Sequence, residues 1–436
     1  MKMKSTLRLV AAVLLLASVS CNKEPETPVE PDPRQEEKQE QPPEEPPLPP
    51  YIITNTPSAK HYANLQALLD ETGLLSSLGA MGKKIVNDNF TAEQQSAAVT
   101  AISYTYSSPD PQGETVELSA LMYVPDGALD GSKPLTGICL ANHGTIASNA
   151  QCPTESAQFE GALAWKNYAI VMPDYYGFGA SKDRPQGYLD ADNTARNNID
   201  ALVAAICLLA ERQVTNPDKL YSFGYSQGGF NSMANLKFVS QHPELEIGFE
   251  KVFCGGSPFD VLATWNAYIG GTFNNSLAFV PMTLVSINET HKLGLDYARL
   301  FKGTLLSNYQ DWILSKKYTT NQISDFLDGQ GISDILHEDM IAGTGDAYDA
   351  VREVCESYSL TGGWTPSPDS FIVLFHSKAD DTVPIDNLQP MIDFLESNGF
   401  VSGTSGPGHY YPCSEEYYGS HMGAVLYYVL VALKEF

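Results

Sequence analysis

The sequence predicts an α/β protein with a mostly parallel central sheet, helices on both faces of the sheet, and an inserted helical cap. Short continuous apolar runs alternate with segments of helical periodicity, a pattern typical of parallel strands that are buried on both faces. One stretch of about 110 residues after Gly256 interrupts this alternation, and it carries only helical and loop patterns. The alternation predicts the sheet, and the interruption predicts the cap.

The first twenty residues read as a signal peptide. Three basic residues precede an apolar run at residues 9–17, and small residues then lead to Cys21. The run is about half the roughly 20 residues that a membrane-spanning helix needs. The segment ending at Cys21 resembles the lipobox of bacterial lipoproteins, which implies cleavage before Cys21 and lipidation of its thiol. The alternative is an ordinary secreted protein with a stray cysteine.

Residues 21–50 form the predicted tether, which starts at the lipidated Cys21. Ten of the 29 residues in 22–50 are proline, and nine are acidic against three basic. Such a segment has too few apolar side chains to offset the entropy of folding, so we expect a disordered, extended linker. Asn22-Lys23-Glu24 resembles the short signals of surface lipoproteins. We therefore expect a bacterial cell-envelope lipoprotein of the outer membrane, either periplasmic or surface-exposed.

The net charge of the remaining chain limits which kinds of molecule can bind to it. Residues 51–436 carry 43 acidic and 20 basic side chains, a net charge of −23. A domain this acidic repels phosphate backbones, which excludes nucleic acid as a partner and favours a neutral or cationic small-molecule substrate.

The elements of the predicted core follow in chain order. Six apolar runs are expected to be strands, and three segments with apolar faces are expected to be helices. The expected strands are Glu117–Val124, Gly137–Ala141, Tyr168–Met172, Leu220–Phe223 and Val252–Cys254, with Phe371–Phe375 as the last core strand; the expected helices are Leu189–Arg212, Asn231–Val239 and Gly423–Phe436.

The expected cap divides the core into two parts. The first part of the core spans residues 51–256, the cap 257–368, and the second part of the core 369–436. A loop this long without structure of its own would be anomalous in a compact domain. The alternative to a cap is an elaborated connection between a strand and a helix.

Six cysteines follow Cys21, and none forms a Cys-x-x-Cys pair, so we expect no thiolate metal site. Cys139, Cys207 and Cys254 lie in apolar runs and read as buried thiols. Cys152 and Cys413 lie in expected loops, where a disulfide between them is possible in an exported protein.

The segment Gly224-Tyr225-Ser226-Gln227-Gly228 fits G-x-S-x-G, the nucleophile elbow. This motif requires a strand before it and a helix after it, and both are expected here. Both glycines leave room for the tight turn that lifts the serine above the sheet. The sequence therefore predicts Ser226 as a nucleophile, with the next helix pointing its N-terminus at a developing oxyanion.

An activating base and its acid are expected after the last strand. In this class of fold the order along the chain is serine, acid, histidine. Asp380 and Asp381 both follow the expected strand, and the spacing Asp-x-x-Val-Pro favours Asp380, with Asp381 as a turn-capping residue. His409 and His421 follow these acids. We favour His421, which enters the final helix, over His409, which lies in a turn-rich segment.

The oxyanion hole needs two backbone N–H groups. We expect one from Gln227 and the other from Thr145, with Gly144 as the alternative donor. His143 and Asp174 lie upstream of the serine, and both are expected to have structural roles.

The motifs N-H-G-T, P-D-Y-Y-G-F-G-A-S, G-Y-S-Q-G-G, A-D-D-T-V-P and G-S-H-M-G, in this order, resemble the secretory lipase (lipase A-like) group of α/β-hydrolases. The resemblance covers most of residues 90–436. It implies an α/β-hydrolase core, a helical cap, and carboxylic-ester hydrolysis without a metal or cofactor. Ser226, Asp380 and His421 match the triad of that family.

The predicted function is that of a secreted, membrane-anchored serine hydrolase that cleaves carboxylic esters as a lipase or esterase. A carbohydrate esterase removing acetyl or feruloyl groups, or a serine aminopeptidase, would use the same fold. A rival from another class is a non-catalytic binding lipoprotein on a hydrolase scaffold.

Overall fold

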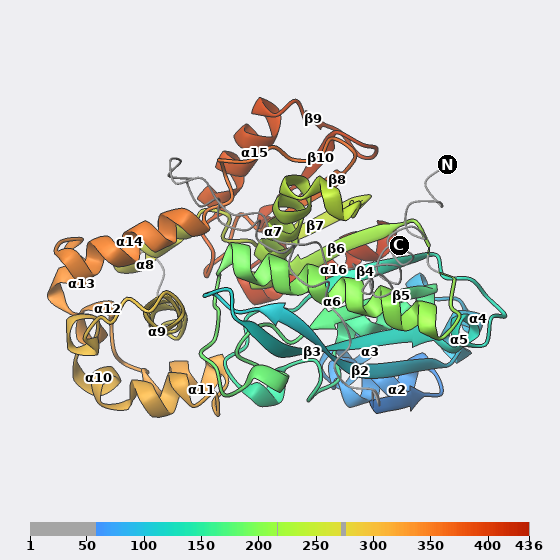
Figure 1. The fold of residues 1–436 in the computed structure, drawn as a ribbon, viewed down its shortest axis with the longest axis horizontal. Helices are drawn as coiled ribbons and strands as arrows, with labels where there is room; N and C mark the ends of the chain where they lie inside the picture. Colours follow the sequence, from blue (N-terminus) through green and yellow to red (C-terminus); the bar gives the residue numbers. More distant parts are fainter. Residues whose placement is uncertain (1–57, 216, 272–275, 436) are drawn as a thin grey trace, which may run out of the picture.

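The computed structural model describes residues 58–215, 217–271 and 276–435 (Figure 1). These residues form one ten-stranded sheet with the strand order β1-β2-β3-β5-β4-β6-β7-β8-β10-β9. The strands are β1 (Ser58–Tyr62), β2 (Val99–Pro109), β3 (Thr115–Pro125), β4 (Gly137–Asn142), β5 (Tyr168–Pro173), β6 (Leu220–Tyr225), β7 (Lys251–Gly255), β8 (Phe371–Phe375), β9 (Val401–Ser402) and β10 (His409–Cys413).

The sheet has an antiparallel part and a parallel part. β1, β2, β3 and β5 pair antiparallel in succession, while every pair from β5 through β4 to β9 is parallel. Because the carboxyl ends of parallel strands meet at one edge, the loops after β4, β6, β7 and β8 lie close together. Apart from Cys21, which lies outside the described residues, the predicted site residues lie in or next to loops that leave this edge or face it.

Alternate residues of the central strands enter two separate hydrophobic cores. Ile138 and Leu140 of β4 face one core, and Cys139 and Ala141 face the other. This division follows from the period of two in a β-strand, and both faces are apolar because both are covered by helices.

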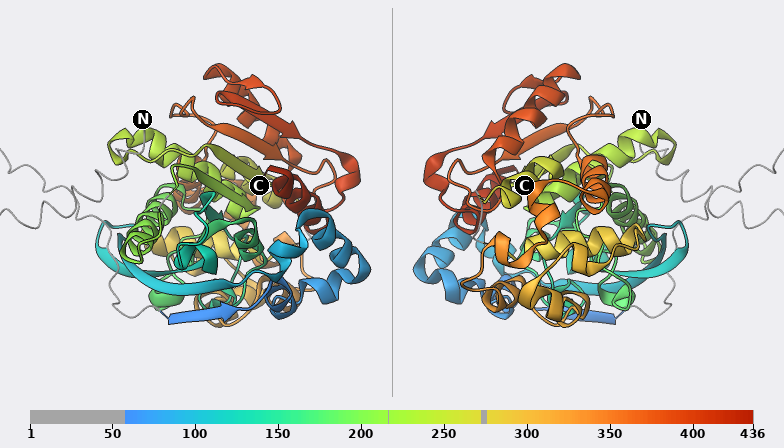
Figure 2. Two further views of the ribbon diagram at one scale, coloured as in Figure 1. Left: turned by 90° about the vertical axis from the view of Figure 1, so that its right-hand side faces the viewer. Right: turned by 90° about the vertical axis from the view of Figure 1, so that its left-hand side faces the viewer.

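Helices cover the two faces as the alternation of the sequence predicts (Figure 2). The first core contains side chains of α6 (Ala191–Glu211), α7 (Gln227–Gln241) and α15 (Leu388–Ser397). The second core contains side chains of α2 (Leu65–Glu71), the 3-10 segment η3 (Phe159–Lys166) and α16 (His421–Glu435). The remaining core helices are α3 (Leu74–Asn89), α4 (Ala92–Ser96) and α5 (Asp126–Leu129).

Between β7 and β8 the regular elements among the described residues are all helical, apart from one isolated bridge, Phe301 to Leu336. This insertion occupies one side of the molecule in Figure 1, and its apolar side chains continue the first core. Its elements are α8 (Val261–Ile269), α9 (Phe279–Thr290), α10 (Gly303–Tyr309), the π-helical turn η7 (Gln310–Leu314), α11 (Thr320–Phe326), α12 (Ile332–Ile335), α13 (Glu338–Ala342) and α14 (Asp346–Tyr358).

The predicted fold class and the expected core elements are confirmed, with boundaries that differ by a few residues. Phe371–Phe375 is not the last strand, however, because β10 and β9 extend the sheet beyond it. The segment around His409, expected to be a surface turn, begins β10. A proline within β10 and the glycines before it conceal this strand in the sequence, since both residue types disfavour sheet.

The segments 1–20 and 21–50, and with them Cys21, lie outside the described residues. Within the described ranges, no helix combines the length and the apolar character needed to cross a membrane.

Candidate active site

Ser226 occupies a sharp turn between β6 and α7, with φ of 59° and ψ of −121°. A non-glycine residue holds such a strained conformation only where its surroundings enforce it. The Ser226 N–H donates to the carbonyl of Gly255, at 2.7 Å. A Cβ on Gly224 would lie 2.4 Å from the Gly228 backbone, and one on Gly228 would lie 2.0 Å from the Asn142 carbonyl oxygen. Both glycines of the motif are therefore required by contact, as the sequence predicts.

Asp380 is the carboxylate that contacts the His421 ring. Its Oδ2 lies 2.7 Å from His421 Nδ1. Its Oδ1 accepts the backbone N–H groups of Thr382 and Val383, at 2.9 and 2.8 Å. These bonds fix the carboxylate from both sides, so one oxygen is held toward the imidazole while the other is anchored to its own turn.

Asp381, the alternative acid, contacts a different part of the same histidine. Its Oδ1 accepts the backbone N–H of His421, at 3.1 Å, where α16 begins. A carboxylate at this position satisfies one of the free N–H groups of the first helical turn. Asp381 thus has a capping geometry, although it caps the final helix in addition to lying in the acid turn.

His376 is a second histidine beside Asp380. It is fully buried directly after β8, and its Nε2 lies 3.4 Å from Asp380 Oδ2 and 3.1 Å from the Val383 carbonyl. Burial alone raises the pKa of Asp380, but the hydrogen bonds from His376 and His421 outweigh burial and hold that pKa well below its usual range. Asp380 is therefore ionised at neutral pH. His376 is not among the predicted site residues, because a histidine after a strand has no distinguishing pattern.

His421 is the first residue of α16 and is buried beside the elbow. Its ring centroid lies 5.0 Å from that of Tyr225, and its carbonyl accepts the Tyr225 hydroxyl at 2.8 Å. A Cβ on Gly256 would lie 3.1 Å from His421 Cε1. Tyr225 precedes Ser226 directly, so these contacts bring His421 next to the nucleophile turn.

His409, the alternative histidine, lies elsewhere. It begins β10, three strands from β6, and its Nδ1 lies 2.9 Å from the Pro407 carbonyl. Adjacent strands are about 4.8 Å apart, so this separation places His409 well away from the elbow.

The loop after β4 lies against the elbow. A Cβ on Gly144 would lie 3.5 Å from the Tyr225 carbonyl oxygen. The Thr145 hydroxyl lies 3.3 Å from the Tyr188 hydroxyl, and Gln227 begins α7 and is buried. The first N–H groups of a helix have no partner within the helix, so the Gln227 N–H is available to an anion.

A buried amide network beneath this loop was not foreseen. The Asn142 side-chain amide donates to the hydroxyls of Ser222 and Ser232, and its oxygen accepts from Asn198 and Asn235. These partners belong to β6, α7 and α6. The network ties the end of β4, where the loop with Gly144 and Thr145 begins, to the elements on either side of Ser226.

His143 and Asp174 have structural environments, as expected. The His143 ring stacks on Tyr175 with centroids 3.9 Å apart, and burial lowers its pKa to about 4, so the ring is neutral at pH 7. Asp174 accepts bonds from Ser119 Oγ and from the N–H and hydroxyl of Thr154. Burial raises the pKa of Asp174 to about 6 despite these bonds.

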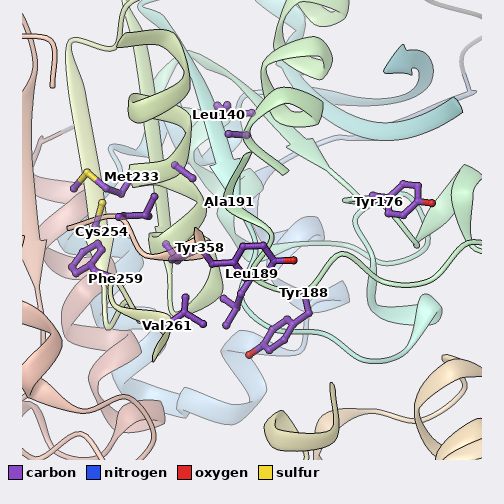
Figure 3. Close-up of a cluster of buried hydrophobic side chains, with 14 of the residues drawn as sticks. Leu140, Tyr176, Tyr188, Leu189, Ala191, Met233, Cys254, Phe259, Val261 and Tyr358 are labelled. Atoms are coloured by element: carbon purple, nitrogen blue, oxygen red, sulfur yellow. The ribbon is translucent and has the colours of Figure 1, made fainter. Parts of the chain in front are cut away.

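A pocket of about 520 Å³ opens onto Ser226 and Gln227. Its walls come from the loop before α6, from the acid turn, and from α8 and α9 of the insertion. Figure 3 shows Tyr188, Leu189 and Val261 of this wall together. The other lining residues are Pro258, Thr264, Trp265, Tyr268, Phe279, Val280, Thr283, Thr382 and Val383.

The cysteines correct one expectation. All six in the described part of the chain are free, so the possible disulfide between Cys152 and Cys413 is not formed. Cys413 Sγ instead lies 3.0 Å from the Tyr418 hydroxyl. Cys139 and Cys254 are buried as predicted, but Cys207 is partly exposed, because it lies toward the outer side of α6.

The described residues contain no group of three or more potential metal ligands.

No protein-family model matches the chain, and no curated protein matches it significantly. Solved structures, in contrast, are similar to the chain. The rice cell wall degrading esterase LipA from Xanthomonas oryzae is 18% identical, with a TM-score of 0.68 over 88% of this chain and 95% of its own. A protein from Legionella pneumophila is also 18% identical, with a TM-score of 0.68 over 86% and 96%. Candida antarctica lipase A is 14% identical, with a TM-score of 0.54 over 84% and 77%. Together with the sheet order and the elbow, these similarities show that the chain has the α/β-hydrolase fold.

Proposed function

We propose that the protein is a serine hydrolase of carboxylic esters, with Ser226 as nucleophile, His421 as general base and Asp380 as the acid that orients the base. One observation carries this proposal. A serine in a strained elbow faces an apolar pocket, and a histidine bonded to an ionised carboxylate packs against the adjoining tyrosine. This is the set of groups that acyl transfer requires.

In the first half of the reaction, Ser226 Oγ attacks the ester carbonyl while its proton passes to His421 Nε2. Asp380 accepts the Nδ1–H bond of His421 and stabilises the imidazolium. The N–H groups of Gln227 and Thr145 bind the negatively charged oxygen, with Gly144 as the alternative donor. The C–O bond of the ester then breaks, and the alcohol leaves with the proton from His421.

In the second half, His421 takes a proton from water as the water oxygen attacks the acyl carbon. The bond between the acyl group and Ser226 Oγ breaks, Oγ regains the proton, and the carboxylic acid is released. No redox partner is needed in either half.

The pocket supports an apolar acyl group as substrate. Its described lining is aromatic and aliphatic apart from Ser226, Gln227 and three threonines, and it includes no Asp or Glu. An aminopeptidase needs an anionic group to bind a substrate ammonium, so this lining favours esters over aminoacyl substrates. Two of the three similar structures, a rice cell wall degrading esterase and a lipase, support acylated cell-wall polysaccharides and lipid esters as candidate substrate sources.

The proposal includes export and anchoring through Cys21. The signal pattern at residues 1–20 and the proline-rich segment that follows support a catalytic domain held near a membrane. Cys21→Ser should move the protein from the membrane fraction to the soluble fraction of the cell envelope. A protein that stays in the membrane after this substitution would contradict lipid anchoring.

Covalent labelling tests the nucleophile. A fluorophosphonate probe should label the purified wild-type chain, and Ser226→Ala should abolish labelling together with p-nitrophenyl butyrate hydrolysis. Ser397→Ala, at an exposed serine of α15, is the matched control and should label normally. A folded wild-type protein without labelling would favour the non-catalytic binding function.

A substrate panel then separates the ester sources. The panel contains p-nitrophenyl butyrate, p-nitrophenyl octanoate, acetylated xylan and an aminoacyl nitroanilide. The two p-nitrophenyl esters should be hydrolysed faster than the xylan and the anilide. Faster release of acetate from xylan would identify a carbohydrate esterase instead, and cleavage of the anilide alone would identify an aminopeptidase.

A further inference from the structure

A second cavity lies on the opposite face of the sheet from the candidate active site. It spans about 740 Å³ between α3, η3 and α16, part of it open to solvent, and many of its side chains belong to the second hydrophobic core. Figure 2 shows the blue N-terminal helices beside the dark red α16. The lining residues that carry the argument are Glu160, Ala162, Tyr225, Tyr428 and Val429.

Glu160 is the one carboxyl group among the described residues that line this cavity. Its Oε2 is buried and has no hydrogen-bond partner. The nearby cation of η3, Lys166, donates to the Leu433 carbonyl at 3.0 Å and so does not neutralise Glu160. Burial raises the pKa of Glu160 to about 7. An unpartnered acceptor in an apolar cavity costs free energy, which a ligand with a donor would recover.

The walls of the cavity reach the catalytic framework from behind. The Tyr428 hydroxyl accepts the N–H of Gly224 at 2.9 Å, and the Tyr225 hydroxyl donates to the His421 carbonyl at 2.8 Å. Both tyrosines line the cavity. A molecule bound there would contact the two side chains that hold the elbow and the base.

We propose that this cavity is a second binding site, which takes a slender apolar molecule ending in one hydrogen-bond donor, a primary amine or an alcohol, with the donor on the Glu160 carboxyl group. Water in the cavity would leave its aliphatic and aromatic walls without apolar contacts. The site does not depend on ester hydrolysis, because it shares no lining residue with the pocket at Ser226.

Titration calorimetry on the full chain with n-octylamine and with 1-octanol tests the proposal. Val429→Trp should fill the second cavity and abolish binding of both probes. Thr283→Trp fills the pocket at Ser226 and is the matched control, in which binding should persist. Ala162→Phe is a second filling variant, to be used if Val429→Trp unfolds at a much lower temperature than the wild type.

Glu160→Gln tests the polar contact. It should weaken octylamine binding at least tenfold, because charge-assisted hydrogen bonds are about twice as strong as neutral ones, and should change octanol binding less. Glu155→Gln, an exposed acid of the same segment, should change neither.

Three outcomes would overturn the proposal. The first is the absence of binding to the wild type, and the second is binding that survives both cavity-filling variants. The third is binding that is lost in Thr283→Trp and kept in Val429→Trp, which would assign the probes to the active-site pocket. A failure of fluorophosphonate labelling would contradict the hydrolase function and leave these measurements intact.

Discussion

The carboxyl edge of the sheet and the helical insertion contribute to one pocket by different means. At the sheet edge, residue identity is dictated by backbone contacts, as with Gly228, whose Cβ would meet the Asn142 carbonyl at 2.0 Å. In the insertion, Trp265 and Phe279 line the pocket with their side chains. Their identity does not depend on a backbone contact as close as the one at Gly228. Under the proposed function, the edge therefore supplies the groups that react, and the insertion shapes the space for the substrate.

The largest effect is expected from Asp380→Asn at the sheet edge. An asparagine amide would donate an N–H to His421 Nδ1 and so favour the imidazole tautomer that carries its proton on Nε2, which cannot act as the base. Such a change typically lowers turnover about 10⁴-fold. Asp381→Asn should cost about tenfold or less, because the amide oxygen still accepts the His421 N–H. The measurement is kcat/KM on p-nitrophenyl butyrate for both variants. An equal loss in the two variants would contradict the assignment of the acid.

The elbow glycine is expected to have the next largest effect, on stability. Gly228→Ala places a methyl group 2.0 Å from a backbone oxygen that cannot move away without breaking β4 pairing, so we expect a loss of about 3 kcal/mol or more in unfolding free energy. Gly248→Ala, where a Cβ would meet nothing within 4 Å, is the control. Chemical denaturation of the two variants compares them. A Gly228→Ala protein as stable as the control would show that the turn is looser than these contacts imply.

The same contrast explains which structural features could be predicted from the sequence and which could not. Apolar runs of strand length and the G-x-S-x-G spacing predict β4 to β8 and Ser226, because those elements obey local rules. β10 was not predicted, because Pro412 and the glycines before it are typical of turns. Only the pairing with β8 makes this segment a strand. The partnership of His376 with Asp380 and the Asn142 network depend on side chains from distant segments, which no local pattern records.

The pocket wall offers a smaller effect, on specificity. Thr283 of α9 is buried and lines the pocket, so Thr283→Trp should shorten the accessible acyl site. Hydrolysis of p-nitrophenyl octanoate should fall about 100-fold relative to p-nitrophenyl acetate, which is the loss expected from about 3 kcal/mol of lost apolar contact. Val429→Trp, in the other cavity, should preserve the ratio of the two rates. A uniform loss on both esters would mean that the acyl chain lies elsewhere.

The smallest effect is expected where the insertion meets the core, at Lys316. Its buried Nζ donates to the carbonyls of Gly177, at 2.6 Å, and Arg184. Burial lowers the pKa of Lys316 to about 8, with the charge of Asp183 opposing the shift. The two carbonyls need only two N–H donors, so a neutral amine keeps both bonds.

The sign of the resulting pH dependence follows from proton binding. Between about pH 8 and the ordinary lysine pKa, the unfolded chain binds a proton that the folded chain has released, so stability rises with pH in this window. The unfolding free energy of the wild type relative to Lys316→Met should therefore rise by about 1–2 kcal/mol between pH 7.5 and 9.5. Lys317→Met, at the exposed neighbour paired with Asp311, should show no such rise. A difference that stays flat with pH would mean that the Lys316 amine reaches solvent in the folded protein.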